Sequence, residues 1–330
     1  MDMLGEINKK NINIKKLISY VGSLLMVISI VFVTRRFISM REDINLLVLS
    51  NVWVFIPLII VALGESVTVF LASFNFRSLV ADLSKVSIKR HVAVKAYNVA
   101  NMYKFIPGGI MYVVGRNLMA VETERLSHKK VALGTLLEGV LFVVVALSLS
   151  LIYSFEHFVY YVGHITTLPF RWLVLVLALV LVTLILYVFR RRIFPALKGV
   201  KPGIDKVIFI SMVRRLPFMF VIISMWGLSF LATLVILGQQ VTFRLGITIV
   251  GLYLLSWLVG FLTPGAPSGL GIREFILLMF MGNVLNPEIL LSAIIMHRAL
   301  QIVGDVIAFI LTMGYVIITG KGISSIKTEQ

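Results

Sequence analysis

Long hydrophobic runs separated by short polar segments make up most of the chain. Six of these runs are long enough to cross about 30 Å of hydrocarbon: residues 17–34, 46–71, 131–152, 172–189, 216–237 and 289–318. Two further hydrophobic stretches, 92–115 and 245–284, are each interrupted by a Pro-Gly pair. The pattern predicts about six complete membrane-spanning helices and two interrupted helices that enter the membrane as re-entrant hairpins.

The two interrupted stretches carry the same motif. Pro107-Gly108-Gly109 precedes Arg116 in the first, and Pro264-Gly265 precedes Arg273 in the second, with the same interval from proline to arginine. A broken, glycine-rich and arginine-bearing segment that occurs twice in an apolar chain is typical of transporters built from internal repeats. We therefore predict one membrane domain made of two repeats, approximately residues 17–152 and 172–318.

The spans predicted between the two motifs determine the relative orientation of the repeats. Three complete spans, 131–152, 172–189 and 216–237, separate the motifs. An odd number of crossings inverts the second copy, so that one hairpin enters from each side of the membrane. If both interrupted stretches instead cross completely, the repeats are parallel.

The composition agrees with a membrane protein. Hydrophobic residues make up 59% of the 330 residues and charged residues only 14%, and the mean hydropathy is +1.00. Such a chain is too apolar for a water-soluble globular protein. We therefore predict an all-α polytopic membrane protein.

The net charge of +16 records orientation rather than nucleic-acid binding, because the basic residues lie in short connections between the hydrophobic runs. Segment 190–206 is rich in Arg and Lys, whereas segment 153–170 has neither. Basic loops stay on the cytoplasmic side and attract anionic lipid headgroups. The pattern places both termini in the cytoplasm, in a multi-pass protein of the cell membrane, with no nucleic acid as partner.

The motif residues resemble a known family. Segment 264–274 reads P-G-A-P-S-G-L-G-I-R-E, and with segment 101–116 it is similar to the lysylphosphatidylglycerol synthase transmembrane-region family, also called the flippase-like domain family. The resemblance covers nearly the whole chain and implies a domain that moves lipid across the bilayer. Ser268 stands where many members have glycine. Members that make aminoacyl-phospholipids add a soluble transferase domain; this sequence ends at Gln330 without one and so resembles the stand-alone members.

The second motif also has the chemistry of an anion site. A Pro-Gly break at membrane depth frees backbone polar groups, which only protein or a wet cavity can satisfy. The following helix directs its N-terminal amides at the loop, and arginine suits bidentate phosphate contact. The predicted lipid-headgroup cavity is formed by Arg273, Arg116, Gly269, Gly271, Ser268, Glu274, Asn101 and Tyr97. Alternatively, the breaks only kink the helices and the arginines are interfacial anchors.

Polar residues in the last hydrophobic run form a second candidate group. His297, Arg298, Gln301 and Asp305 fall on one helical face, which must point into the bundle because charges facing lipid are costly. Glu138 lies inside the 131–152 span, 22 residues after Arg116, and Arg298 similarly follows Arg273 by 25 residues. We hypothesise that Glu138 and Arg298 meet near the symmetry axis, as a gating or coupling pair. The alternative is a static ion pair of Arg298 with Asp305 or Glu138.

Glu65, in the second hydrophobic run, is assigned no single role. It could line the cavity, or it could approach Arg77 or Lys85 near the cytoplasmic side.

Together these features predict a lipid flippase or translocase for an anionic phospholipid or a polyprenyl-phosphate-linked lipid. Neither cofactor nor metal is expected, and catalysis is disfavoured, because the sequence lacks cysteine, clustered acids and a phosphate-binding loop. One alternative is a non-catalytic scaffold for a cell-envelope enzyme, and another is a membrane-embedded lipid-modifying transferase. Without an ATP-binding loop, transport would follow the lipid gradient or be coupled to an ion.

Overall fold

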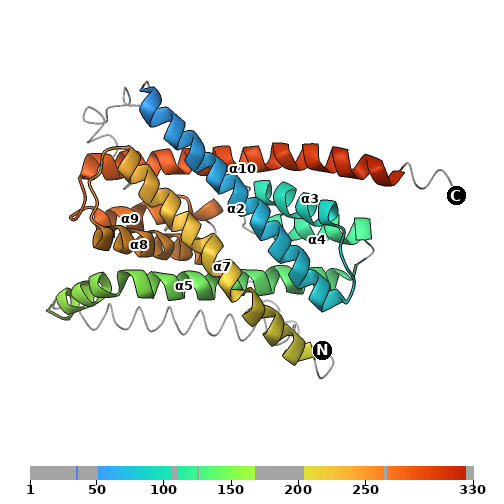
Figure 1. The fold of residues 1–330 in the computed structure, drawn as a ribbon. Coiled ribbons are helices and arrows are strands. Elements are labelled where there is room, and N and C mark those ends of the chain that lie inside the picture. Colours follow the sequence, from blue (N-terminus) through green and yellow to red (C-terminus); the bar gives the residue numbers. More distant parts are fainter. Residues whose placement is uncertain are drawn as a thin grey trace, which may run out of the picture.

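The computed structural model describes residue 35 and segments 51–105, 111–124, 126–167, 204–263 and 266–324. All regular structure in these segments is helical (Figure 1). The helices are α2 (Val52–Ser84), α3 (Arg90–Asn101), η2 (Met102–Phe105), α4 (Met111–Glu124), α5 (His128–Thr167), α7 (Ile204–Ile236), α8 (Phe243–Leu262), η3 (Pro267–Gly269), α9 (Ile272–Met281) and α10 (Pro287–Ser324). The predicted spans 17–34 and 172–189 and both Pro-Gly pairs lie outside the described residues.

Five of the described helices are long and apolar enough to cross a membrane. They are α2, α8 and the segments His128–Ser154 of α5, Phe209–Ile236 of α7 and Pro287–Thr319 of α10. Large apolar side chains cover their outer faces: Ile60, Val221 and Ile310 are 62%, 57% and 61% exposed. This exposure suits hydrocarbon and is costly in water. The predicted all-helical membrane class is confirmed.

The two interrupted stretches differ in length. In the first, α3 has only 12 residues and is followed directly by η2. In the second, α8 has 20 residues, which at 1.5 Å per residue covers about 30 Å and is enough to cross the hydrocarbon alone. Polar residues recur along α3, whereas α8 is apolar along nearly its whole length. The re-entrant form predicted for both stretches therefore suits α3 better than α8.

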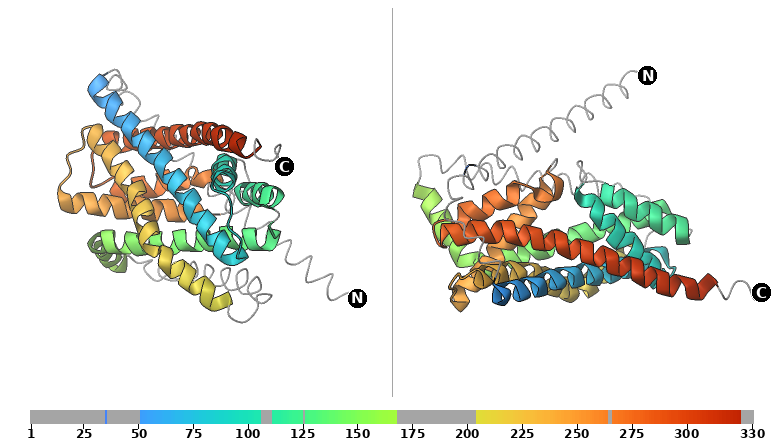
Figure 2. Two further views of the ribbon diagram at one scale, coloured as in Figure 1. Left: turned by 45° about the vertical axis from the view of Figure 1, so that its right-hand side comes forward. Right: turned by 90° about the horizontal axis from the view of Figure 1, so that it is seen from above.

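Helices α2 and α7 pack together in antiparallel directions. Side-chain hydrogen bonds join Glu65 to Ser229, Thr68 to Trp226, Ser78 to Arg215 and Asp82 to Ser211. Because residue numbers rise along α2 as they fall along α7, the two helices run in opposite directions, as the colours in Figure 1 also show. In the view from above in Figure 2, both helices lie on one side of the molecule.

The order α2-α3-η2-α4-α5 recurs as α7-α8-η3-α9-α10. The packing between these two halves also recurs when they are exchanged: α5 packs on α8 as α10 packs on α3, and α10 packs on α2 as α5 packs on α7. The helices α2 and α7 contact each other, and so do η2 and η3. In Figure 1, α10 and α5 form opposite edges, with the shorter helices between them. The interrupted segments of the two halves thus meet at the centre.

Gly304 allows α10 to lie directly against α2. A Cβ atom at this position would be 2.7 Å from Cβ of Glu65 and 2.9 Å from the carbonyl oxygen of Ala62. We predict that Gly304→Val lowers the free energy of unfolding in detergent by about 1–3 kcal/mol, because overpacking forces the two helices apart. Gly314→Val, on the same helix with open space around it, is the matched control. Equal stability of the two variants would contradict the close packing.

Candidate functional site

The segment between α8 and α9 has an unusual backbone. Ser268, Gly269 and Gly271 have φ angles of 51°, 68° and 82°, in the left-handed region. A Cβ atom at Gly269 would be only 2.9 Å from Cα of Gly260 in α8, so glycine is needed there for space as well as for conformation. Ser268 adopts a left-handed angle that glycine takes more readily than serine. The loop therefore turns back tightly onto α8.

Arg273 lies in the first turn of α9, where its side chain is close to Gly260 and Gly269. It is only 7% exposed. Its guanidinium donates hydrogen bonds from Nη2 to the hydroxyl of Tyr253 (2.6 Å) and from Nη1 to Oε1 of Gln301 (3.3 Å). Within the described segments, its Nε has no hydrogen-bond partner and no carboxylate lies within ion-pair distance. Arg273 is thus a buried cation whose direct partners are neutral.

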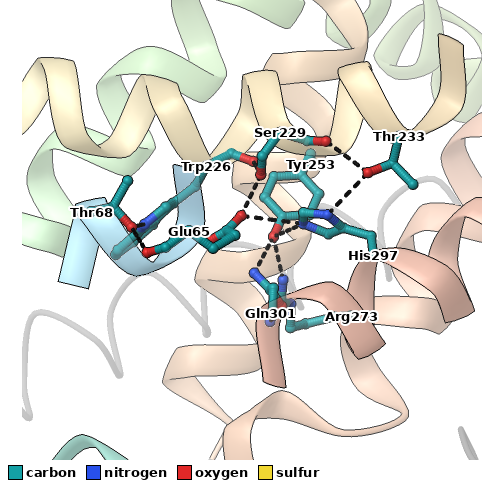
Figure 3. Close-up of polar contacts among 9 residues, drawn as sticks. All are labelled: Glu65, Thr68, Trp226, Ser229, Thr233, Tyr253, Arg273, His297 and Gln301. Carbon is teal, nitrogen blue, oxygen red and sulfur yellow. Dashed lines mark hydrogen bonds and ion pairs between the residues drawn. The ribbon is translucent and has the colours of Figure 1, made fainter. Parts of the chain in front are cut away.

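Tyr253 on α8 is the centre of a polar network (Figure 3). Besides Arg273, its hydroxyl contacts Nε2 of Gln301 (2.9 Å) and Nε2 of His297 (3.0 Å), both from α10. The network continues from His297 to Thr233 on α7 and to Glu65 on α2. Side chains from α2, α7, α8, α9 and α10 are therefore joined through one phenol.

Arg298 lies beside this network, where it contacts Glu274 and the loop between α8 and α9. It forms an ion pair with Glu274 (3.5 Å) and donates a hydrogen bond to the carbonyl oxygen of Ser268 (3.1 Å). The Arg298 and Glu274 side chains are 16% and 14% exposed, more than Arg273. Glu274 thus neutralises Arg298, which comes from α10, and not the adjacent Arg273.

A small cavity lies among these side chains. Its polar lining is Tyr253, Arg273, Glu274, His297, Arg298 and Gln301, and apolar side chains from α7, α9 and α10 complete it. The volume of about 10 Å³ is close to the smallest space that holds one water molecule. A phosphate group does not fit in this conformation.

The corresponding residues of the first half form a different cluster. Arg116 pairs with Glu138 on α5 (2.6 Å), and the two side chains are only 6% and 1% exposed. The guanidinium also lies over the rings of Tyr97 (3.7 Å to the centroid) and Tyr112 (5.3 Å). Burial raises the pKa of both phenols, which are therefore neutral and present π faces to the cation. Arg116 is consequently a buried, compensated cation and not an interfacial anchor.

The predicted pairing of Glu138 with Arg298 is wrong. Glu138 binds Arg116, and Arg298 binds Glu274, because α4 and α9, which carry Arg116 and Glu274, each pack on the long helix that follows them in the chain. The alternative pair of Arg298 with Asp305 does not form either. Asp305 instead binds Lys104 of η2 (2.7 Å) and accepts a hydrogen bond from Asn101 (2.7 Å), which joins the two halves.

Five of the predicted cavity residues lie together near the Tyr253 network: Arg273, Gly269, Gly271, Ser268 and Glu274. Tyr97 and Arg116 lie together with Glu138 in the first half, and Asn101 lies at the contact between the halves. Glu65 lies near neither Arg77 nor Lys85, because Arg77 is about 18 Å further along α2 and Lys85 lies beyond the end of that helix. The sequence did not predict the contact of Glu65 with Ser229 or the central position of Tyr253. Tyr253 precedes the second Pro-Gly break much as Tyr97 precedes the first, and this similarity was the available signal.

No protein-family model matches this chain, and no characterised protein matches it in sequence. The resemblance to the flippase-like domain family therefore stays a prediction. Within the described part of the chain, no group of three His, Asp or Glu side chains gathers as a metal site.

The buried Arg116–Glu138 pair can be tested by a double-mutant cycle. We predict that Glu138→Leu lowers the free energy of unfolding by about 3–5 kcal/mol, and that Arg116→Met does so by a similar amount, because each leaves the buried charge of its partner uncompensated. The double variant Arg116→Met, Glu138→Leu should lose less, since both charges are then absent. Stability is measured by unfolding in denaturing detergent, with the exposed Glu288→Gln as control. Strictly additive effects at the two positions would contradict the pair.

Proposed function

We propose that this protein is a lipid flippase or translocase that binds an anionic phospholipid or polyprenyl-phosphate headgroup at Arg273. The observation that carries the proposal is the buried guanidinium with only neutral direct partners in the described segments. Burial of an uncompensated charge is costly. An anionic ligand would remove this cost by supplying the missing negative charge.

The position of Arg273 favours an anion as well. It lies in the first turn of α9, where the backbone amides are not used within the helix and the helix dipole is positive. Its free Nε–H and its Nη groups form a planar fork that matches a phosphate. Arg116 differs because the carboxylate of Glu138 already neutralises its guanidinium. The proposed headgroup site therefore lies in the second half alone.

Headgroup binding requires a change in conformation. The cavity at Arg273 is too small for a phosphate, and the more exposed Arg298–Glu274 pair closes its edge. Separation of this pair would enlarge the cavity and give the headgroup two arginines. The antiparallel α2 and α7 and the exchanged packing of the two halves support a mechanism in which inverted repeats expose the cavity alternately. In this proposal the protein lies in the cell membrane with both termini in the cytoplasm.

The test is transbilayer movement of labelled phosphatidylglycerol and of a labelled polyprenyl phosphate in liposomes that contain the purified protein. We predict that Arg273→Ala and Arg298→Ala each reduce the rate roughly tenfold or more, because a charge-assisted hydrogen bond contributes about 1.5–3 kcal/mol. Arg214→Ala removes an exposed arginine on α7 and should leave the rate unchanged. Labelled phosphatidylcholine reports selectivity for anionic headgroups.

A folded protein that moves none of these lipids would overturn the proposal. It would favour a membrane scaffold, whose partner enzyme could then be sought by co-purification. Chemical change of a lipid in the same liposomes would instead favour a transferase. Equal rates for wild type and Arg273→Ala would remove Arg273 from the site.

A further inference from the structure

Glu65 is a buried carboxyl group that headgroup binding does not use. It lies in α2, and its side chain is 7% exposed. Its carboxylate accepts a hydrogen bond from Ser229, and Oε1 is 3.9 Å from Nε2 of His297 (Figure 3). The close contact with Gly304 leaves little space beside it. A carboxyl group and an imidazole enclosed in this way are too far apart to share a hydrogen bond, but one proton can reside on either of them.

The charges around this pair come from several elements. Lys104 on η2, Arg273 and Glu274 on α9, and Arg298 and Asp305 on α10 act on Glu65, on His297 or on their direct neighbours. Tyr253 on α8 contacts His297, and α7 contributes the uncharged Ser229 and Thr233. Glu138 on α5 and Tyr97 on α3 belong to the Arg116 cluster. His297 therefore faces the positive charges of Arg273 and Arg298, which oppose a further positive charge on its ring.

The hydrogen bonds of Tyr253 define the protonation of His297 in this structure. Arg273 and Gln301 both donate N–H groups to the Tyr253 hydroxyl and fill its two lone pairs. The phenolic proton must then be donated to Nε2 of His297 at 3.0 Å. An imidazole that accepts at Nε2 is neutral and carries its proton on Nδ1, which faces Thr233 at 3.5 Å.

A proton added to His297 changes this arrangement. Nε2 then becomes a donor, directed at Tyr253 or at Glu65. Tyr253 would have three N–H neighbours for two lone pairs, and its own proton would lose its acceptor. One of the N–H donors must leave, and Arg273 is the one that an anion can receive. A bound anion also offsets the positive charge that opposes protonation of His297.

We propose that Glu65 and His297 form a proton-binding site that is linked through Tyr253 to Arg273, so that one proton and one anionic headgroup bind together. The inference rests on the proposed headgroup site and adds its energy source: a proton gradient drives the movement of lipid. A singly charged headgroup and a proton together carry no net charge, which lowers the cost of moving both through the apolar bundle.

The first test measures proton uptake by the purified protein in weakly buffered detergent when short-chain phosphatidylglycerol is added. We predict uptake of about one proton per bound lipid, and loss of uptake in Glu65→Gln and in His297→Gln, since each removes half of the proton site. Tyr253→Phe should still bind the lipid but take up no proton, because the link is broken. Tyr315→Phe, elsewhere on α10, is the matched control and should behave as wild type.

The second test examines the proton site in the protein alone, without added lipid. An infrared titration over a pH range that includes the usual values of carboxyl and imidazole groups, about pH 4 to 8, should show a protonated carboxyl band that is absent in Glu65→Gln and present in Glu288→Gln, or an imidazolium band that is absent in His297→Gln. Absence of both bands in the wild type overturns the proton site. Suppose that the protein binds the lipid without proton uptake, and that a pH gradient does not change lipid movement in the liposome assay. These results would overturn the coupling and leave the flippase proposal intact. Failure to bind the lipid overturns both.

Discussion

The burial of charge among apolar helices is the constraint on which this structure depends. Each buried arginine of the described segments contacts a polar partner on a different helix: Arg116 binds Glu138, Arg215 binds Asp82, and Arg273 binds Tyr253. Because an unsatisfied guanidinium at these depths is costly, these contacts fix how the helices are placed relative to one another. The apolar surfaces supply contact area but little direction, since lipid is as apolar as the helices themselves.

The same constraint explains why the two halves differ in chemistry while they share an order of elements. In the first half the charge of Arg116 is neutralised within a cluster of aromatic rings and one carboxylate. In the second half the adjacent carboxylate, Glu274, forms an ion pair with Arg298. Arg273 is left with neutral partners and with a polar network that extends to Glu65. One repeated segment thus places its arginine against a carboxylate in the first half and against neutral partners in the second.

The fold class could be read from the sequence, and much of the site could not. Hydrophobic runs identify helices because a span needs about 20 apolar residues whatever surrounds it. The end of α2 at Ser84, well beyond the predicted end at residue 71, depends on its packing against α7. Spacing along the chain located Arg116, Arg273 and the polar face of α10. It could not show that Glu138 meets Arg116 and not Arg298, because partners of buried charges are chosen by three-dimensional packing.

Glu65 shows the same limit from the opposite direction. In the sequence it is one acid in a long apolar run, and the nearby basic residues of the loop are its most obvious partners. In the structure it is placed at the crossing of α2, α7 and α10, where Gly304 and Ser229 make room for its carboxyl group and bind it. That crossing brings it within 3.9 Å of His297 and, through Tyr253, to the cation at the break between α8 and α9. In the proposed coupling, a change of charge at either end alters the hydrogen bonds of Tyr253, which joins His297 to Arg273.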